Sequence, residues 1–341
     1  MEEVSRLGID TVAFPQLGIE LTVDKEAFVL FGLSIKWYGI MIALGLLLAM
    51  IYCFKRTKQF GIDGDKLIDG VFFGLIGAVI GARLYYVVLH RESFHDIRDV
   101  LAIRDGGLAV YGGIIGALLF GFVTAKIRKI RVLPSFDLAA MGFLIGQGIG
   151  RWGNFFNQEA FGTNTVLPWG MTGGRIQNYL LYMQESLAAQ GMEVNPYLPV
   201  HPCFLYEFIW CMTGFVILHF YHTKRRFDGE LLCMYAFWYG LGRFFIEGLR
   251  TDSLYIGSFR ASQVLALVSA AAALAVIIAM RIVVKKKGMV LYRDTEESKT
   301  MLAELERAEK KEAEKKRAKK EKRQELSAED KIISDNDEND I

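Results

Sequence analysis

The chain has 341 residues, of which 52% are hydrophobic and 13% aromatic, and its formal net charge is +2. The small net charge hides two unlike parts, because residues up to about 284 are mostly long apolar runs and the rest is rich in lysine and glutamate. This distribution excludes a soluble helical protein, since the run "SQVLALVSAAAALAVIIAM" has no polar face to turn toward water. It gives no indication of a nucleic-acid partner.

The residue types that bind metals or form disulfides show no useful spacing. The four cysteines, Cys53, Cys203, Cys211 and Cys233, show no paired spacing in the sequence. They are interpreted as small buried hydrophobic residues. The five histidines form no metal-ligand motif, and we expect neither a metal nor a cofactor. The absence of a GxSxG motif, a serine–histidine–acid arrangement and a nucleotide loop disfavours a hydrolase or a kinase. The polar N-terminus does not resemble a cleaved signal peptide.

Seven apolar runs are long enough to cross a membrane, which takes roughly 20 mostly apolar residues. In chain order they cover about 34–54, 67–89, 108–125, 136–156, 204–221, 231–249 and 262–284. The chain is therefore predicted to be an all-α polytopic membrane protein. Residues 1–284 form the transmembrane domain, and 285–341 form a charged tail.

The loops between these spans differ in their positive charge. Lysine and arginine are dense after the first, third, fifth and seventh spans, whereas the long loop at about 157–203 carries only Arg175. The positive-inside rule then predicts seven spans with the N-terminus outside and the tail in the cytoplasm. Glycines repeat within several spans, and we interpret most of them as helix–helix contacts.

Polar residues gather at the predicted outer ends of the spans. The fourth span ends in "GRWGNFFNQEAFG", and the sixth ends in "WYGLGRFFIEGLRTDS". These segments and the outer parts of the other spans supply Arg151, Asn154, Asn157, Glu159, Arg243, Glu247, His201, Tyr206, Glu207, Tyr38, Tyr111 and Arg83. The inner ends carry mainly ordinary loop lysines and arginines, so polar groups are expected at one end of the bundle only.

Arginines beside a headgroup layer indicate a binding site for the phosphate of a lipid. One guanidinium group can donate two parallel hydrogen bonds to two oxygens of a phosphate. Each residue also has a simpler interpretation. Arg243 and Glu247 could form only an i,i+4 ion pair, and Arg83 could extend to the membrane interface. Tyr38 could belong to an interfacial aromatic belt, as could the neighbouring tryptophans. Because so many polar residues fall at the same predicted end of the bundle, we favour the phosphate-binding site over these simpler interpretations.

Two other classes of function fit part of the pattern. A transporter or flippase for an anionic lipid would explain arginines and glycines, but it predicts polar residues at the midplane and inverted repeats. A non-catalytic membrane anchor, with the tail bound to a partner or to anionic lipid, would not explain the outer cluster. The clustering favours an enzyme that displaces a phosphate ester at carbon, which needs stabilisation of the leaving group and an activated nucleophile.

The segment "GRWGNFFNQEAFG" closely resembles the hallmark of the prolipoprotein diacylglyceryl transferase family. The blocks "IKWYGI", "GAVIGARLYY", "GGLAVYGG", "HPCFLYE" and "GRFFIEGLRTD" resemble other motifs of that family in the same order, over roughly residues 30 to 275. The resemblance implies a bacterial plasma (inner) membrane enzyme with seven spans, a small periplasmic head at about 157–203 and an active site facing the outer leaflet.

The resemblance also implies an activity, which is the first step of bacterial lipoprotein maturation. Diacylglyceryl passes from phosphatidylglycerol to the lipobox cysteine thiol of an exported prolipoprotein, and a thioether and glycerol phosphate are formed. Arg151 and Arg243 would hold the phosphate and neutralise the leaving group. Other functional positions of the family fall on Tyr38, Asn154, Glu159, Gly162, Tyr239 and Glu247, with Arg83 and His201 as further lipid contacts.

One position departs from part of the family. Many members have a histidine where this chain has Tyr111, and that histidine is a candidate base. A tyrosine with a pKa of about 10 is a poor base at pH 7. Either the arginines activate Tyr111, or Glu247 or His201 removes the thiol proton, or the arginine field alone stabilises the thiolate. We favour the last interpretation, with Tyr111 as a hydrogen-bonding group that positions the substrate.

The tail alternates lysine and glutamate over "AELERAEKKEAEKKRAKKEKRQELSAED". This pattern predicts a solvated helix with i,i+4 ion pairs, followed by a disordered acidic end. The basic part could contact anionic lipids of the inner leaflet, or it could be a solvated extension without a partner.

Overall fold

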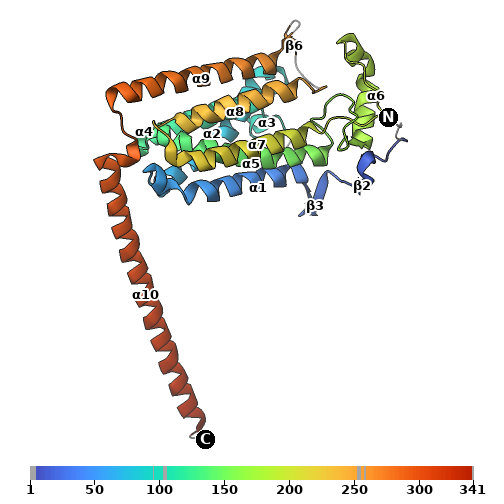
Figure 1. Cartoon of the computed structure of the whole chain (residues 1–341). Helices are drawn as coiled ribbons and strands as arrows, with labels where there is room; N and C mark the ends of the chain where they lie inside the picture. The colour runs from blue at the N-terminus through green and yellow to red at the C-terminus, as the bar shows by residue number, and fades with distance from the viewer. Residues whose placement is uncertain (1–4, 95, 103–105, 252–254, 257–258, 340–341) are drawn as a thin grey trace. The chain divides into compact units, whose positions relative to one another are not determined.

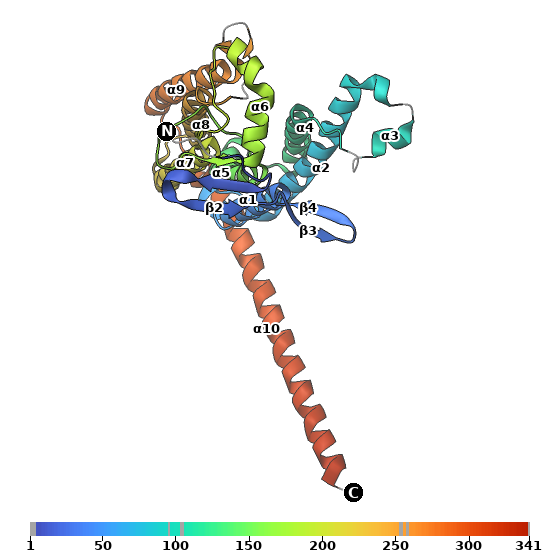
Figure 2. The ribbon, with the colours of Figure 1, turned by 90° about the vertical axis from the view of Figure 1, so that its right-hand side faces the viewer.

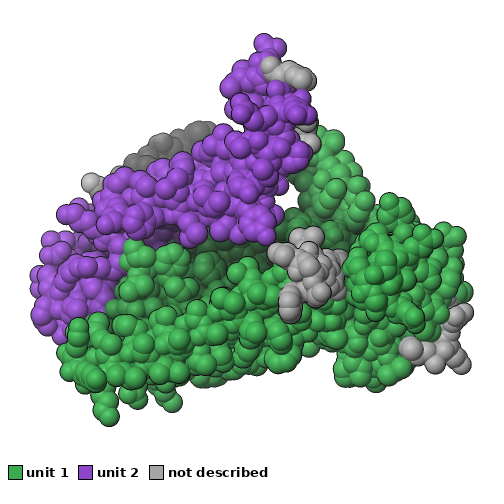
Figure 3. Space-filling model, turned by 90° about the horizontal axis from the view of Figure 1, so that it is seen from above, with its two compact units in different colours: residues 1–57, 132–291 green, residues 58–131, 292–341 purple. Residues whose placement is uncertain are grey.

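The computed structural model describes the whole chain except residues 1–4, 95, 103–105, 252–254, 257–258 and 340–341, and it is mostly helical (Figure 1). The described residues divide into two compact units. One unit contains residues 1–57 and 132–291, and the other contains 58–131 and 292–341, as the colours of Figure 3 show. Each unit is described by itself.

The first unit is built on five long helices that run side by side (Figure 1). They are α1 (Trp37–Phe54), α5 (Val132–Asn157), α7 (Cys203–Tyr221), α8 (Glu230–Glu247) and α9 (Ala261–Lys287). Helix α5 packs against α1, α7 and α8, and α8 packs against α9. At the α1–α5 contact, a Cβ on Gly45 would lie only 2.9 Å from the carbonyl oxygen of Gly146. Such small residues let helix backbones approach closely in membranes.

A small mixed region adjoins the end of α5 in the same unit (Figure 2). Strands β2 (Ile19–Thr22), β1 (Thr11–Phe14) and β5 (Thr172–Gly173) form an antiparallel sheet in that order, and α6 (Gly174–Ala189) follows β5. The apolar core of this region contains Val12, Val23, Phe155, Phe161, Met171, Ile176, Leu180, Leu187, Val194, Val200 and Phe204. The segment 157–203 therefore folds together with the N-terminal strands.

Among the described residues, the remaining short elements of the first unit are two hairpins and two 3₁₀ turns. The hairpins pair β3 (Glu26–Leu30) with β4 (Leu33–Lys36), and β6 (Tyr255–Ile256) with β7 (Phe259–Arg260). The 3₁₀ turns are η1 (Pro15–Leu17) and η5 (His222–Lys224), and a further one, η2 (Thr57–Phe60), begins at the last residue of this part of the unit and continues in the second unit.

The second unit contains two long helices, α2 (Gly64–Leu89) and α4 (Val110–Arg128), which pack against each other. A Cβ on Gly116 would lie 2.0 Å from the carbonyl oxygen of Gly77, so glycine is needed where these helices cross. The unit also contains η3 (Arg91–Ser93), α3 (Ile97–Leu101), η6 (Tyr292–Asp294) and the tail helix α10 (Glu296–Asn339). The predicted disordered end stays a prediction, and residues 340–341 of it lie outside the described residues.

Six helical segments of the described chain are long and apolar enough to cross a membrane. They are Trp37–Phe54, Gly64–Leu89, Val110–Arg128, Val132–Asn157, Cys203–Lys224 and Ala261–Arg317, the last of which includes α9. Helix α8, the predicted sixth span, carries Glu230, Arg243 and Glu247 within its 18 residues and is not among them. The fold is therefore that of a polytopic membrane protein, and the seventh span stays a prediction.

Candidate functional site

One buried carboxylate lies at the centre of the candidate site. Glu207, in the first half of α7, has a side chain that is only 4% exposed. Arg151 near the end of α5 approaches Glu207 Oε2 at 2.6 Å, and Arg243 of α8 approaches Oε1 at 3.0 Å. Arg250, which follows α8, reaches the same Oε1 at 3.3 Å. Three arginines, from α5, from α8 and from the segment just after α8, thus meet at one glutamate.

The predicted pair of Arg243 and Glu247 is present, at 2.6 Å. It is not the only contact of Arg243, because the same guanidinium also reaches Glu207. The backbone oxygen of Glu247 accepts a hydrogen bond from Arg260, the last residue of β7. Arg243 therefore joins two acidic side chains, and a role confined to an i,i+4 pair does not describe it.

The polar residues after Arg151 form a second chain of contacts. Arg151 Nη1 donates to Asn154 Oδ1 at 3.5 Å, and Asn154 Nδ2 donates to Glu159 Oε1 at 2.8 Å. Asn157 Nδ2 donates to the same oxygen at 3.3 Å. Glu159 lies between Gln158 and Ala160, both of which have positive φ angles, so the backbone turns sharply here. This turn returns a carboxylate toward the face that carries Arg151.

Gly162 lies where the chain leaves that turn. Its N–H donates to the carbonyl of His201, and it pairs with Arg250 in an isolated antiparallel bridge. A Cβ at Gly162 would lie 2.7 Å from the carbonyl oxygen of Leu249. The lack of a side chain therefore permits a close approach between two segments of this chain, and this approach positions Arg250.

His201 lies before α7, and its Nδ1 is 3.1 Å from the hydroxyl of Tyr206. Partial burial lowers the pKa of His201 below its usual value of about 6.5. The imidazole is therefore neutral at pH 7 and can accept or donate one hydrogen bond at each nitrogen, depending on its tautomer.

Tyr38 and Tyr239 approach the site from two other helices. A Cβ on Gly153 of α5 would lie 2.7 Å from Cδ2 of Tyr38, so this ring packs directly on the α5 backbone. Tyr239 of α8 lines a small pocket of about 190 Å³ together with Glu207 and Arg243. A larger hollow of about 530 Å³ adjoins the turn and is lined by Asn157, Gln158, Glu159, Ala160, Phe161, Arg175, Tyr179 and Thr251.

Two of the predicted site residues, Arg83 and Tyr111, belong to the second unit. Arg83 is only 7% exposed, and its guanidinium donates to the backbone oxygens of Asp99, Val100, Ala102, Gly106 and Gly107. It therefore holds the described part of the loop after α2 and does not extend to solvent as a snorkelling side chain would. Tyr111, in the first turn of α4, is 71% exposed. Binding of a lipid by Arg83 and positioning by Tyr111 stay predictions.

The structure adds Arg250 to the predicted polar residues and gives Glu207, which is already among them, the central place. Both stand in the sequence blocks noted above, "HPCFLYE" and "GRFFIEGLRTD". Glu207 lies on α7 and its partners lie on α5 and α8, so local spacing could not show that they meet. Arg250 lies past the end of α8, where helical periodicity no longer predicts a direction.

The apolar helices define a multi-pass membrane protein, and three arginines meet at one buried glutamate at one end of them. The model of the family described as prolipoprotein diacylglyceryl transferase matches residues 25–279. The chain belongs to that family. The whole tail, residues 285–341, falls outside the match.

Relatives support the same assignment. The phosphatidylglycerol–prolipoprotein diacylglyceryl transferase of Clostridium novyi (strain NT) is 40% identical over 247 residues, which cover 72% of this chain and 91% of that protein. The protein of the same name from Thermotoga maritima is 38% identical over 252 residues, covering 73% of this chain and 82% of the relative. The one from Clostridioides difficile (strain 630) is 38% identical over 247 residues, covering 72% of this chain and 91% of the relative.

Proposed function

We propose that this chain is a transferase that moves the diacylglyceryl group of phosphatidylglycerol to the lipobox cysteine thiol of exported prolipoproteins. A thioether forms, and glycerol phosphate leaves. Family membership and the relatives' names, which state this lipid and this acceptor, support the reaction class. The observation that carries the assignment to a site is the meeting of Arg151, Arg243 and Arg250 at Glu207.

The arginines bind the phosphodiester of the lipid and stabilise the leaving phosphate. Three guanidinium groups and the two carboxylates of Glu207 and Glu247 take part in the described ion pairs, so this group of side chains has a formal charge of +1. Such a partly buried excess of positive charge favours an anion. It also stabilises the negative charge that develops on the departing oxygen. Asn154 and Glu159 orient Arg151.

The acceptor sulfur must be a thiolate to attack the glycerol carbon, whose bond to the phosphate ester oxygen then breaks. A free thiol has a pKa of about 8.5, and a cationic field lowers it. We assign this effect to Arg151 and Arg243, with Glu247 and neutral His201 as the nearby groups able to accept the proton. Tyr111 acts as a positioning residue, and Tyr38, Gly162 and Tyr239 complete the binding site.

The same proposal includes an orientation in the membrane. The chain crosses the bacterial plasma membrane seven times, with α8 as one span, the N-terminus outside and the tail in the cytoplasm. The distribution of lysine and arginine among the loops supports this topology. In this topology the candidate site faces the outer leaflet, and the region at about 157–203 forms a periplasmic head.

The test is a transfer assay on the purified full chain with labelled phosphatidylglycerol and a lipobox peptide. Wild type should label the peptide cysteine, and Arg151→Ala should reduce the rate by about 100-fold or more, as expected for loss of a leaving-group stabiliser. Arg307→Ala, which removes an exposed arginine of α10, is the matched control and should keep the wild-type rate.

Two results would contradict the proposal. Wild type that moves labelled lipid across a vesicle membrane without labelling the peptide would indicate the transporter. Equal rates for Arg151→Ala and Arg307→Ala would remove the arginine cluster from the mechanism.

A further inference from the structure

The start of the tail is packed against the loops at one end of α2 and α4, within the second unit. Ser298 of α10 is fully buried, and its hydroxyl donates to the carbonyl of Gly61 at 3.3 Å. A Cβ on Gly61 would lie 2.2 Å from the Ser298 oxygen, so only glycine allows this contact. Further along α10, Glu309 pairs with Lys58 at 2.7 Å. The first turns of the tail are therefore a packed part of this unit.

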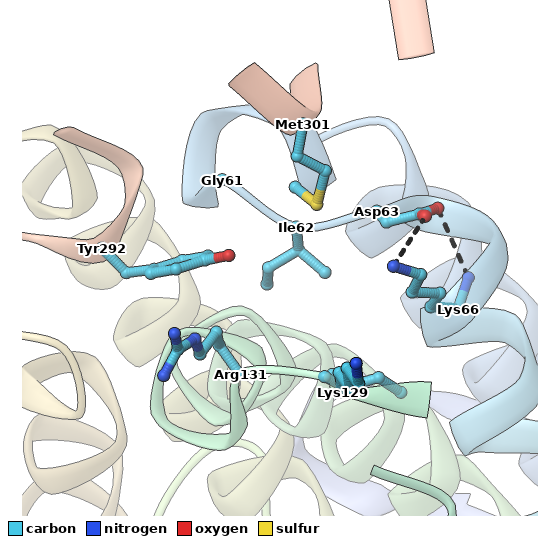
Figure 4. A pocket seen from close by; sticks show the side chains of 9 residues that line it. Gly61, Ile62, Asp63, Lys66, Lys129, Arg131, Tyr292 and Met301 are labelled. Carbon is cyan, nitrogen blue, oxygen red and sulfur yellow. Dashed lines mark hydrogen bonds and ion pairs between the residues drawn. The ribbon is translucent and has the colours of Figure 1, made fainter. Parts of the chain in front are cut away.

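This packing forms a shallow, solvent-open hollow, which spans about 250 Å³ when the solvent at its mouth is included (Figure 4). Its apolar side chains are Ile62, Ile130 and Met301, and Ile62 is only 4% exposed. Three cationic side chains line it as well: Lys66, Lys129 and Arg131. Tyr292 and Met301 come from the tail, so the hollow has all its walls only when the tail is packed in place.

The cations of the hollow differ in their partners. Lys66 lies 3.7 Å from Asp63, which is also the N-cap of α2, and Figure 4 shows this pair. Arg131 pairs with Glu297 and lies beneath the ring of Tyr292. Lys129 has no carboxylate within ion-pair distance among the residues that the structure describes. Lys129 is exposed, and its positive φ of 56° marks the end of α4 at the hollow. Of the three cations, Lys129 can therefore pair with an incoming anion without giving up a carboxylate.

The position of the hollow suggests the source of such an anion. The hollow lies where α2 begins and α4 ends, and both helices belong to the segments long and apolar enough to cross a membrane. The ends of such helices lie at the level of lipid headgroups. Basic pockets at this level attract phosphate-bearing headgroups. The hollow is lined by both apolar and cationic side chains, which suits an amphipathic ligand.

We propose that this hollow binds the phosphate group of an anionic lipid headgroup, with Lys129, Lys66 and Arg131 as its cationic ligands and Tyr292 of the tail as one wall. This site is separate from the transfer reaction, and its residues have no part in the proposed function. It gives the tail a defined role, because residues outside the family match complete it.

The test measures binding to the purified full chain in a neutral detergent. The probes are inorganic phosphate, dihexanoyl phosphatidic acid and, as a zwitterionic reference, dihexanoyl phosphatidylcholine. Lys129→Gly removes the charge and suits the positive φ, so it should fold normally. We expect Lys129→Gly to weaken binding of the anionic probes by about fivefold or more, which is the usual contribution of one lysine near an anionic membrane surface. Tyr292→Ala should weaken it as well.

Lys126→Ala is the matched control, because Lys126 lies one turn earlier on α4, over the ring of Phe122, and does not line the hollow. It should bind as wild type does. Loss of both anionic probes in Lys129→Gly supports a phosphate site, and loss of the lipid alone assigns it to headgroups. Equal binding by wild type and Lys129→Gly, or an equal loss in Lys126→Ala, overturns the proposal, since the attraction would then be absent or diffuse.

Discussion

The two ends of the helices in the first unit hold buried charges in different ways. At one end, three arginines share Glu207. At the other end, Asp137 near the start of α5 and Glu230 at the start of α8 are fully buried. Asp137 lies 3.9 Å from Arg225, and Glu230 lies 2.7 Å from Arg281. The two ends are separated by about 21 Å along α5, at 1.5 Å per residue.

The two ends also differ in the hydrogen bonds that their buried acids accept. Asp137 accepts hydrogen bonds from the N–H groups of Gly229 and Leu232, at 2.8 and 3.0 Å, so it caps the start of α8. Glu230 accepts from the hydroxyl of Tyr221 at 3.1 Å. Each acid there has a cation and further donors of its own, which fits a role in holding helices together. Of the two ends, the one at Glu207 combines several cations with few acids, and that arrangement favours an incoming anion.

The largest expected effect tests the structural end. Asp137→Ala should lower the free energy of unfolding by about 3–5 kcal/mol, because the buried Arg225 would lose the carboxylate at 3.9 Å and α8 would lose its cap. The measurement is unfolding in a denaturing detergent series. Transfer activity per folded molecule should stay near that of wild type. Loss of transfer without loss of stability would mean that this end takes part in the reaction.

The second prediction concerns the cation-rich end. Arg243→Ala should reduce kcat/KM for transfer by about 100-fold, since one of the groups that stabilise the leaving phosphate is removed. Arg243→Lys keeps the charge but loses the planar pair of donors that reaches both Glu207 and Glu247, so it should recover only part of the rate. If Arg243→Lys were as active as wild type, charge alone would account for this residue.

A smaller effect is expected at Gly162, because it acts only through backbone contact. Gly162→Ala would place a Cβ 2.7 Å from the carbonyl of Leu249 and displace Arg250. We expect a loss of about 1–3 kcal/mol in stability and a raised KM for the lipid. Gly150→Ala is the control, because a Cβ at that position would meet no other described segment within 4 Å. Equal effects of the two substitutions would contradict the proposed close approach.

The smallest effect is expected at Tyr111. If this residue positions substrate, Tyr111→Phe should retain transfer within about tenfold of wild type, the effect of one lost neutral hydrogen bond. The pH profile of kcat/KM should keep its shape, because no proton acceptor is removed. Complete loss of transfer in a folded variant would count against a positioning role for Tyr111.

Much of the site could be predicted from the sequence, because helical spacing and charge follow simple rules. Arg151 and Asn154 share a face of one helix, and Arg243 and Glu247 share a face of another, so the sequence predicts one polar end. The structure confirms that Arg151 and Arg243 lie together, because both contact Glu207. Glu207 was visible within a polar block but its central place was not, since it depends on how three helices pack. The sheet was not predicted, because β1 pairs with β5 across a long separation in sequence.

One expectation about the helix bundle is wrong. Polar groups were expected at one end only, whereas Asp137 and Glu230 are buried at the other. The sequence does not single out either residue, because it does not show whether a helix start faces water or another helix. Their burial reflects capping and ion pairs made with α8 and α9.

Glu207 has only two carboxylate oxygens, and both are already engaged by guanidinium groups. Each guanidinium group has five N–H donors, so a lipid phosphate can bind the donors that Glu207 leaves over. We infer that the glutamate holds the guanidinium groups together before the lipid arrives. It offsets the mutual repulsion among the arginines between turnovers, so the site keeps its geometry when no lipid is bound.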